Sequence, residues 1–156
     1  MSLIRTGLLL DLNSLYFGIE GKFGKKRLLI AEYLKRIESW GLTLTYKLAY
    51  SKQRMERSPG FATVLQKYGF RIFDGNFHWH ISMALHLAEM IPNIDCFILG
   101  SSILDLGELL DWSKNKGIIT KCFSVGIPEH FHQFGECIEI DKTLLKAPNE
   151  IANTTE

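Results

Sequence analysis

The chain has 156 residues, of which 46% are hydrophobic and 22% charged, a balance typical of one globular domain with an ordinary core. Its formal net charge of +1 excludes a globally basic protein, so any surface for nucleic acid must be local. No apolar stretch approaches the roughly 20 residues that a transmembrane helix needs, and the amino end lacks the features of a signal peptide. We therefore expect a cytoplasmic protein without a membrane partner.

A run of leucines near the amino end stops at a carboxylate, Asp11. A continuous apolar run suits a strand covered on both faces, so residues 8–10 predict the central strand of a parallel sheet. Ligands of open α/β sheets bind beyond the carboxyl ends of the strands, which makes Asp11 the first place to look for a site. An Asx turn or a helix cap at Asp11 and Asn13 is the alternative interpretation.

Strand and helix patterns alternate along the rest of the chain. Residues 18–24 form a glycine-rich connection, and residues 25–27 open a helix that ends near Trp40. This alternation predicts βαβ units, and hence a three-layer α/β/α sandwich with a mainly parallel sheet of five or six strands. Residues 1–140 are expected to form the domain and residues 141–156 a polar tail. Further helices are expected at 61–68, 81–91 and 103–110, and further strands at 43–50, 70–73, 95–99, 118–125 and 137–140.

Three segments carry a resemblance to a known family. The first strand runs into Asp-Leu-Asn-Ser-Leu-Tyr at 11–16, residues 77–86 read Phe-His-Trp-His-Ile-Ser-Met-Ala-Leu-His, and residues 99–104 read Leu-Gly-Ser-Ser-Ile-Leu. At these places the NYN domain, a PIN-like nuclease family that includes the LabA-type proteins, has patterns like D-G-E-N-L-Y, K-G-V-D-V-A-L-A-V-D and S-G-D-S-D-F. The chain resembles this family over residues 7–140. The resemblance implies a PIN-like fold and a nuclease that cuts RNA with water activated by Mg²⁺ or Mn²⁺ in an acidic pocket.

The acidic pattern of that family is incomplete in this sequence. Asp11 matches the first acid, whereas the later acids of the pattern fall at His80, Ser101 and Ile103. Hard cations need several oxygen ligands, and one carboxylate with two serine hydroxyls is a poor substitute. We therefore expect an RNA-associated domain that has lost nuclease activity, needs no cofactor, and acts as a binding or scaffolding module.

Two alternatives stay open. An active endoribonuclease would use Mg²⁺ or Mn²⁺ with Asp11 as its main catalytic residue and Asn13, Ser101 and Asp105 as unconventional partners. His80 continues the inward stripe of its helix and should point toward Asp11, so the two form a candidate metal site, although a packed histidine is the simpler interpretation. Helical spacing places Asp105 on the flank of its helix, where it should be solvated. The other alternative is a protein-interaction domain or homodimer that uses exposed aromatic residues.

Cations gather in two segments that should follow neighbouring strands. In a parallel sheet both segments would lie at the carboxyl edge beside Asp11, where they could form a basic rim for the phosphate backbone of RNA. Charged loops are more often simply solvated, which is the alternative interpretation. The candidate RNA contacts are Lys22, Lys25, Lys26, Arg27, Lys52, Arg54 and Arg57.

Overall fold

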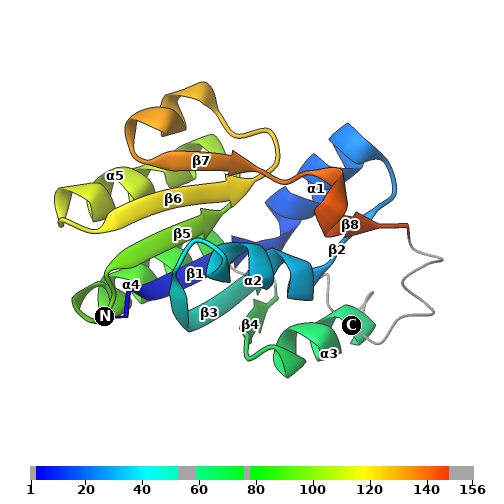
Figure 1. The fold of residues 1–156 in the computed structure, drawn as a ribbon, viewed down its shortest axis with the longest axis horizontal. Coiled ribbons are helices and arrows are strands. Elements are labelled where there is room, and N and C mark those ends of the chain that lie inside the picture. The colour runs from blue at the N-terminus through cyan, green and yellow to red at the C-terminus, as the bar shows by residue number, and fades with distance from the viewer. Residues whose placement is uncertain (1–2, 53–58, 76–77, 148–156) are drawn as a thin grey trace.

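A computed structural model of the chain describes residues 3–52, 59–75 and 78–147 (Figure 1). Its centre is a six-stranded sheet in which every pair of neighbouring strands is parallel. The α/β class and the parallel sheet predicted from the sequence are confirmed. In their order across the sheet, the strands are β4 (Arg71–Asp74), β3 (Thr43–Ser51), β1 (Arg5–Asp11), β5 (Cys96–Gly100), β6 (Ile119–Ser124) and β7 (Glu136–Glu139).

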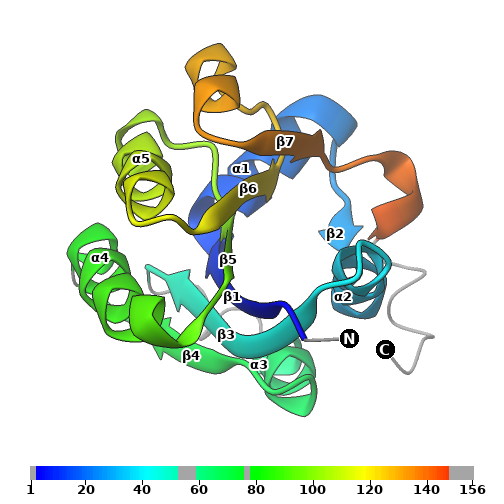
Figure 2. The ribbon, with the colours of Figure 1, turned by 60° about the vertical axis from the view of Figure 1, so that its left-hand side comes forward.

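Helices cover both faces of this sheet, and β1 shows why. Leu8, Leu9 and Leu10 are fully buried, and because side chains alternate along a strand, Leu9 faces one core while the other two face a second core. Helices α4 and α5 pack on the Leu9 side and α1, α2 and α3 on the other, which gives three layers (Figure 2). The helices are α1 (Leu12–Phe23), α2 (Ile30–Glu38), α3 (Pro59–Lys67), α4 (Trp79–Met90) and α5 (Gly107–Asn115).

Among the residues that the structure describes, no helix is both long and apolar enough to cross a bilayer.

The chain reverses its direction across the sheet at β1: it first continues to β3 and β4 on one side, then returns to β5, β6 and β7 on the other. In open α/β sheets the ligand crevice lies at this reversal, beyond the carboxyl ends of the strands. Asp11 ends β1 and Ser101 directly follows β5, so both residues lie at the crevice.

The segment after β1 corrects a prediction, because it is a helix rather than a glycine-rich connection. Asp11 is the N-cap of α1 and accepts a hydrogen bond from the backbone N–H of Ser14. The apolar side chains that α1 buries are Leu12, Leu15 and Ile19, a helical spacing. Helix α1 ends at Gly24, whose φ of 80° favours glycine. Residues 25–27 were predicted to open a helix. Instead they lead into the short strand β2 (Arg27–Leu28).

Helix α1 lies across the carboxyl ends of β5, β6 and β7. Three of its residues, spaced one turn apart, meet the ends of these strands or the residues just after them. The Oγ of Ser14 accepts a hydrogen bond from the N–H of Ser102, and a Cβ on Gly18 would lie 3.0 Å from the Cβ of Val125. The Nζ of Lys22 lies 3.9 Å from a carboxylate oxygen of Glu139. Figure 1 shows α1 beyond the arrowheads of these strands, covering the edge where the candidate site lies.

The predicted boundary between the domain and a polar tail at residue 140 was wrong, because the fold continues past it. The short helix η4 (Lys142–Leu144) buries Leu144, which is 2% exposed, and β8 (Leu145–Lys146) pairs antiparallel with β2. The backbone N–H of Leu29 also donates to the carbonyl of Leu144 at 2.8 Å. Residues 141–147 therefore belong to the domain, and residues 148–156 lie outside the described part of the chain.

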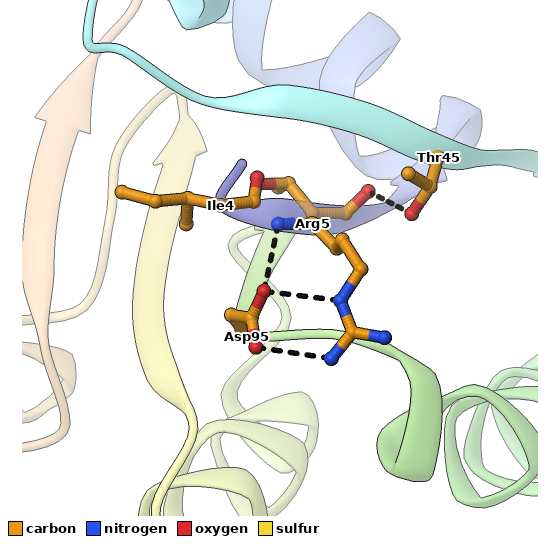
Figure 3. Close-up of polar contacts among 5 residues, drawn as sticks. Ile4, Arg5, Thr45 and Asp95 are labelled. Carbon is orange, nitrogen blue, oxygen red and sulfur yellow. Dashed lines mark hydrogen bonds and ion pairs between the residues drawn. The ribbon is translucent and has the colours of Figure 1, made fainter. Parts of the chain in front are cut away.

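An ion pair joins β1 and β5 at the opposite, amino edge of the sheet. The Arg5 guanidinium donates to both carboxylate oxygens of Asp95, each at 3.2 Å (Figure 3). The backbone N–H of Arg5 also donates to Asp95 at 2.9 Å. These hydrogen bonds hold the pKa of Asp95 below its usual value. Both side chains are well exposed, so the pair fixes the alignment of the two strands more than it adds stability.

Two glycines of α1 test how closely this helix approaches the strand ends. Gly18→Leu should lower the free energy of unfolding by about 1–3 kcal/mol, because the new side chain must displace Val125, whose carbonyl oxygen lies 3.3 Å from the place that a Cβ would take. Gly21→Leu is the matched control. A Cβ there meets nothing within 4 Å, and losing a helical glycine should stabilise by up to about 1 kcal/mol. Denaturant unfolding measures both variants, and equal effects would contradict this placement of α1.

Candidate functional site

The Asp11 carboxylate is the centre of the candidate site. Asp11 is the last residue of β1 and is 0% exposed. Its Oδ1 accepts a hydrogen bond from the N–H of Ser14 at 3.3 Å, and its Oδ2 accepts one from the Oγ of Ser101 at 3.0 Å. One carboxylate thus joins the end of β1, the first turn of α1 and the residue after β5. The helix-cap role that the sequence allowed for Asp11 is confirmed.

Burial raises the pKa of Asp11 above its ordinary value. Hydrogen bonds from Ser14 and Ser101, together with the nearby side chains of Trp79 and His80, act in the opposite direction but do not offset the cost of burying the charge. The folded chain therefore holds a carboxylate that binds a proton more readily than a solvated aspartate does.

His80 points toward Asp11, as its helical spacing predicted. Its Nε2 lies 3.8 Å from Oδ2 of Asp11, beyond hydrogen-bond distance. The Nε2 of His80 and the Nε1 of Trp79 are both buried, and neither has a hydrogen-bond partner among the described residues. The two rings meet edge to face, with centroids 4.5 Å apart. The start of α4 therefore brings two ring nitrogens to the crevice, and neither of them lies in hydrogen-bond geometry to the Asp11 carboxylate.

Further serine hydroxyls lie at the carboxyl ends of β5 and β6. Ser102 donates its N–H to the Oγ of Ser14 at 2.9 Å, and its own Oγ lies 2.9 Å from the Oγ of Ser124, the last residue of β6. The hydroxyl of Ser102 also reaches the carbonyl of Val125. The sequence did not lead us to place Ser14, Ser102 or Ser124 in the site, although Ser102 and Ser124, at the ends of two apolar strands, were a visible signal. The crevice is a hydroxyl network around one acid.

The donors at this crevice do not fit a magnesium or manganese ion. Within residues 3–52, 59–75 and 78–147, no group of three His, Cys, Asp or Glu side chains is placed to hold a metal. Both oxygens of Asp11 already accept hydrogen bonds, and the Oδ1 of Asn13 accepts one from the N–H of Lys52 at 2.9 Å. Asp105 is exposed, as predicted, but it lies in the short 3-10 helix η2 (Leu104–Leu106) before α5. Of the residues proposed as unconventional partners, Ser101 contacts Asp11, whereas Asn13 bonds to Lys52 and Asp105 faces solvent, so the three do not form one ligand set.

The first cationic segment does not lie beside Asp11, where the basic rim was predicted. Helix α1 has 12 residues and so extends about 18 Å from Asp11, which carries the first cationic segment to its far end. From the second segment, Lys52 does lie near the crevice, with its Nζ 6.0 Å from the centre of the Trp79 ring. Arg54 and Arg57 lie outside the described residues. The first cationic segment and Lys52 therefore do not form one rim around Asp11.

At the far end of α1 the cations meet others from the carboxyl-terminal segment. Strand β8 places Lys146 directly opposite Arg27 of β2, an arrangement of like charges that destabilises a strand pair. Lys142 of η4 lines the same hollow as two lysines of α1 and the loop that follows it. We call these residues the basic cluster: Lys22, Lys25, Lys26, Arg27, Lys142 and Lys146.

Two hollows open within the basic cluster and share Lys26. The larger, of about 370 Å³, is lined by Lys22, Phe23, Lys26, Lys142 and Leu145. The smaller, of about 210 Å³, is lined by Tyr16, Glu20, Lys25, Lys26 and Arg27. Each hollow combines lysines with one aromatic ring, and this pairing was not visible while α1 was expected to be a loop.

Comparison with known proteins supports the fold and leaves the function open. No family model matches the chain, and no curated protein matches it. A crystal structure of a protein of unknown function from Vibrio parahaemolyticus is similar, with a TM-score of 0.82 over 92% of this chain and 97% of that one. The two sequences are 14% identical, so the likeness concerns the fold alone.

The buried charge of Asp11 gives a prediction for stability against pH. Because the pKa of Asp11 is raised in the folded state, its contribution to stability is complete below the pKa of the unfolded chain and is lost as pH rises through the raised value. Asp11→Asn keeps an oxygen that can cap α1 and removes the buried charge. The variant should melt at or above the temperature of the parent at pH 7.

This advantage of Asp11→Asn should shrink as the pH falls toward 4, since a protonated aspartate is as neutral as an asparagine. Thermal melts between pH 4 and pH 7 without divalent ions measure it. Asp105→Asn, at an exposed carboxylate, is the matched control. A melting temperature several degrees lower for Asp11→Asn at pH 7 would contradict the interpretation of Asp11 as an unfavourably buried charge.

Proposed function

We propose that the chain is an RNA-associated PIN-like domain of the cytoplasm that binds or scaffolds RNA and has lost metal-dependent nuclease activity. The observation that carries the proposal is the separation of charge over the molecule. Six cations gather at the far end of α1, whereas the carboxyl edge of the sheet has one buried carboxylate among hydroxyls. The choice of RNA rests on the resemblance of the sequence to the NYN family.

The basic cluster has the composition of a surface for a single strand. Such surfaces combine cations that follow the phosphates with aromatic rings on which bases stack. Here Phe23 and Tyr16 lie in adjacent hollows, and Lys26 lies between them. Glu20 and Glu139 are the acids that the structure places beside these hollows, so the cluster stays positive even though the whole chain is nearly neutral.

The crevice at Asp11 supports the loss of nuclease activity. A pocket of several carboxylates repels itself and needs a cation to offset that repulsion. In this chain the hydroxyls of Ser101, Ser102 and Ser124 lie at the ends of β5 and β6 instead, and they bond to one another, to Asp11 or to the backbone. Asp11 and the serine hydroxyls therefore have hydrogen-bond partners without a metal ion, whereas the ring nitrogens of Trp79 and His80 have none among the described residues.

Adding Mg²⁺ should leave the melting temperature of the protein unchanged and should not support cleavage of RNA. The physical reason is that one carboxylate already holding two hydrogen bonds gains little from a divalent ion. Melting curves with and without millimolar Mg²⁺, and gels of labelled RNA, measure the two effects. An upward shift in melting temperature, together with Mg²⁺-dependent cleavage that disappears in Asp11→Asn, would establish the active nuclease instead.

RNA affinity should fall steeply with salt and should depend on the basic cluster. Each phosphate neutralised on a single strand adds about 0.7 to the slope of log affinity against log salt, so three or four engaged cations predict a slope near −2 to −3. Replacing Lys25, Lys26 and Arg27 together with Ala should remove about 2 of this slope. The loss should be similar for unrelated RNA sequences, because phosphate contacts carry no sequence information.

The control for this experiment replaces three exposed lysines on other helices or turns, Lys35, Lys67 and Lys116, which changes the net charge by the same amount. Fluorescence anisotropy with two unrelated RNA strands measures binding, and circular dichroism confirms folding. An equal loss in both triple variants would mean that net charge alone attracts RNA. No binding at low salt would overturn the proposal.

A protein-interaction role is the second candidate, and helix α4 favours it. Ile81 and Leu85 lie one turn apart on this helix and are 60% and 62% exposed. Large apolar side chains in adjacent exposed positions are typical of contact surfaces. If RNA binding is absent, sedimentation of the parent and of Ile81→Asp with Leu85→Asp tests whether this face joins two copies of the chain.

A further inference from the structure

The larger hollow of the basic cluster has the size and lining of a ligand pocket. Its volume of about 370 Å³ falls within the range of small-molecule sites, about 300–1,000 Å³. Three ammonium groups, from Lys22, Lys26 and Lys142, share the hollow with an aromatic ring, Phe23, and an aliphatic side chain, Leu145. A single phosphate ion would leave most of this space unfilled, whereas a nucleotide would occupy it.

The segment that brings Lys142 to the pocket is firmly anchored. The N–H of Thr143 donates to the carboxylate of Asp141 at 2.9 Å, and Arg36 of α2 donates to both residues, at 3.3 Å to Asp141 and 3.0 Å to the hydroxyl of Thr143. Leu144, the residue after Thr143, is buried in the core. Lys142 is therefore held opposite the end of α1 by the fold and does not sit on a loose tail.

The charge of the pocket selects the kind of anion. Within the described part of the chain, no carboxylate forms an ion pair with Lys26 or Lys142. Lys22 has one long ion pair, in which its Nζ lies 3.9 Å from a carboxylate oxygen of Glu139. Three lysines beside one acid leave a net charge of about two, which matches a phosphate monoester at about −1.5 to −2 better than a diester at −1. Lysine binds phosphate as a point charge, so no bidentate geometry is required.

The apolar walls add a second requirement. The ring of Phe23 is partly exposed in the pocket, with the Nζ of Lys22 5.4 Å from its centre. An aromatic ring beside phosphate-binding cations offers a stacking surface for a base. Lys26 leads from this pocket into the smaller hollow, where Tyr16 and Arg27 repeat the combination of ring and cation. A strand that begins in the larger pocket can therefore continue into the smaller one.

We infer that the pocket between α1 and η4 binds a nucleotide that carries a phosphate monoester, supplied by the phosphorylated end of an RNA strand. This inference rests on the proposed function and adds to it that the chain recognises strand ends. A free nucleoside monophosphate carries the same chemistry and is the other possible source. Lys142 is the residue that distinguishes the pocket from general attraction to phosphates, since it comes from the far end of the sequence.

The test compares one short RNA sequence with a 5′-phosphate, with a 3′-phosphate or with hydroxyls at both ends, alongside adenosine monophosphate. In fluorescence anisotropy or calorimetry at moderate salt, one phosphorylated strand should bind about tenfold more tightly than the hydroxyl-ended strand. Lys142→Ala should reduce this preference to less than about twofold. Lys146→Ala is the matched control, because Lys146 lies on the same segment outside the pocket lining and should keep the preference.

The outcomes separate the two proposals. Equal binding of phosphorylated and hydroxyl-ended RNA overturns the pocket and leaves the RNA-binding proposal standing. Binding of adenosine monophosphate that needs Lys142, without binding of any RNA strand, supports the pocket with the free nucleotide as its source and overturns the RNA proposal. Absence of all binding overturns both. A preference for phosphorylated ends that survives Lys142→Ala places the recognition elsewhere and overturns the pocket.

Discussion

The buried carboxylate of Asp11 is the interaction on which the carboxyl edge of the molecule depends. It ends the central strand β1, caps the first turn of α1 through Ser14, and holds Ser101 after β5. These three segments end or directly follow β1 and β5, the neighbouring strands at which the chain reverses direction across the sheet. Burying this charge is unfavourable, as its raised pKa indicates, and the two hydrogen bonds offset part of that cost. An uncharged cap would serve α1 as well, so the retained acid is unexplained by stability alone.

The course of α1 separates two regions that the sequence predicted to lie together. Because α1 crosses the carboxyl ends of β5 to β7, it covers the crevice at Asp11 and carries Lys22 and the cations that follow the helix about 18 Å away. The far end of α1 then meets η4 and β8, which add Lys142 and Lys146. The molecule thus has a covered, nearly neutral crevice and a separate, open, positive surface. A binding role needs only the second of these regions.

The sequence predicted the sheet well and the path of the chain around it less well. Leu8 to Leu10, and the regular alternation of strand and helix patterns, were enough for the parallel sheet, and helical spacing placed His80 facing Asp11. Helix α1 was missed because Gly18, Gly21 and Gly24 lie close together in its sequence, although one packs against Val125 and another caps the helix. The segment 141–147 was missed because its burial depends on partners distant in sequence, Arg36 and Leu28, which no local pattern contains. The basic cluster follows from both segments, so neither it nor its hollows could be predicted.

The serines of the crevice also explain why carboxylates could not simply be introduced at Ser101 and Ile103. Ser101 is fully buried and its Oγ lies 3.0 Å from Oδ2 of Asp11, so a carboxylate there would face another buried carboxylate at contact distance. Two such charges cannot both stay ionised without a cation between them. Ile103 packs against the core on the Leu9 side of the sheet, where an acid would lose apolar contacts as well as water. A chain with the full acidic pattern would depend on a divalent ion for its fold. This chain instead has serine hydroxyls at the crevice, which bond to Asp11, to one another and to the backbone and bring no second buried charge to Asp11.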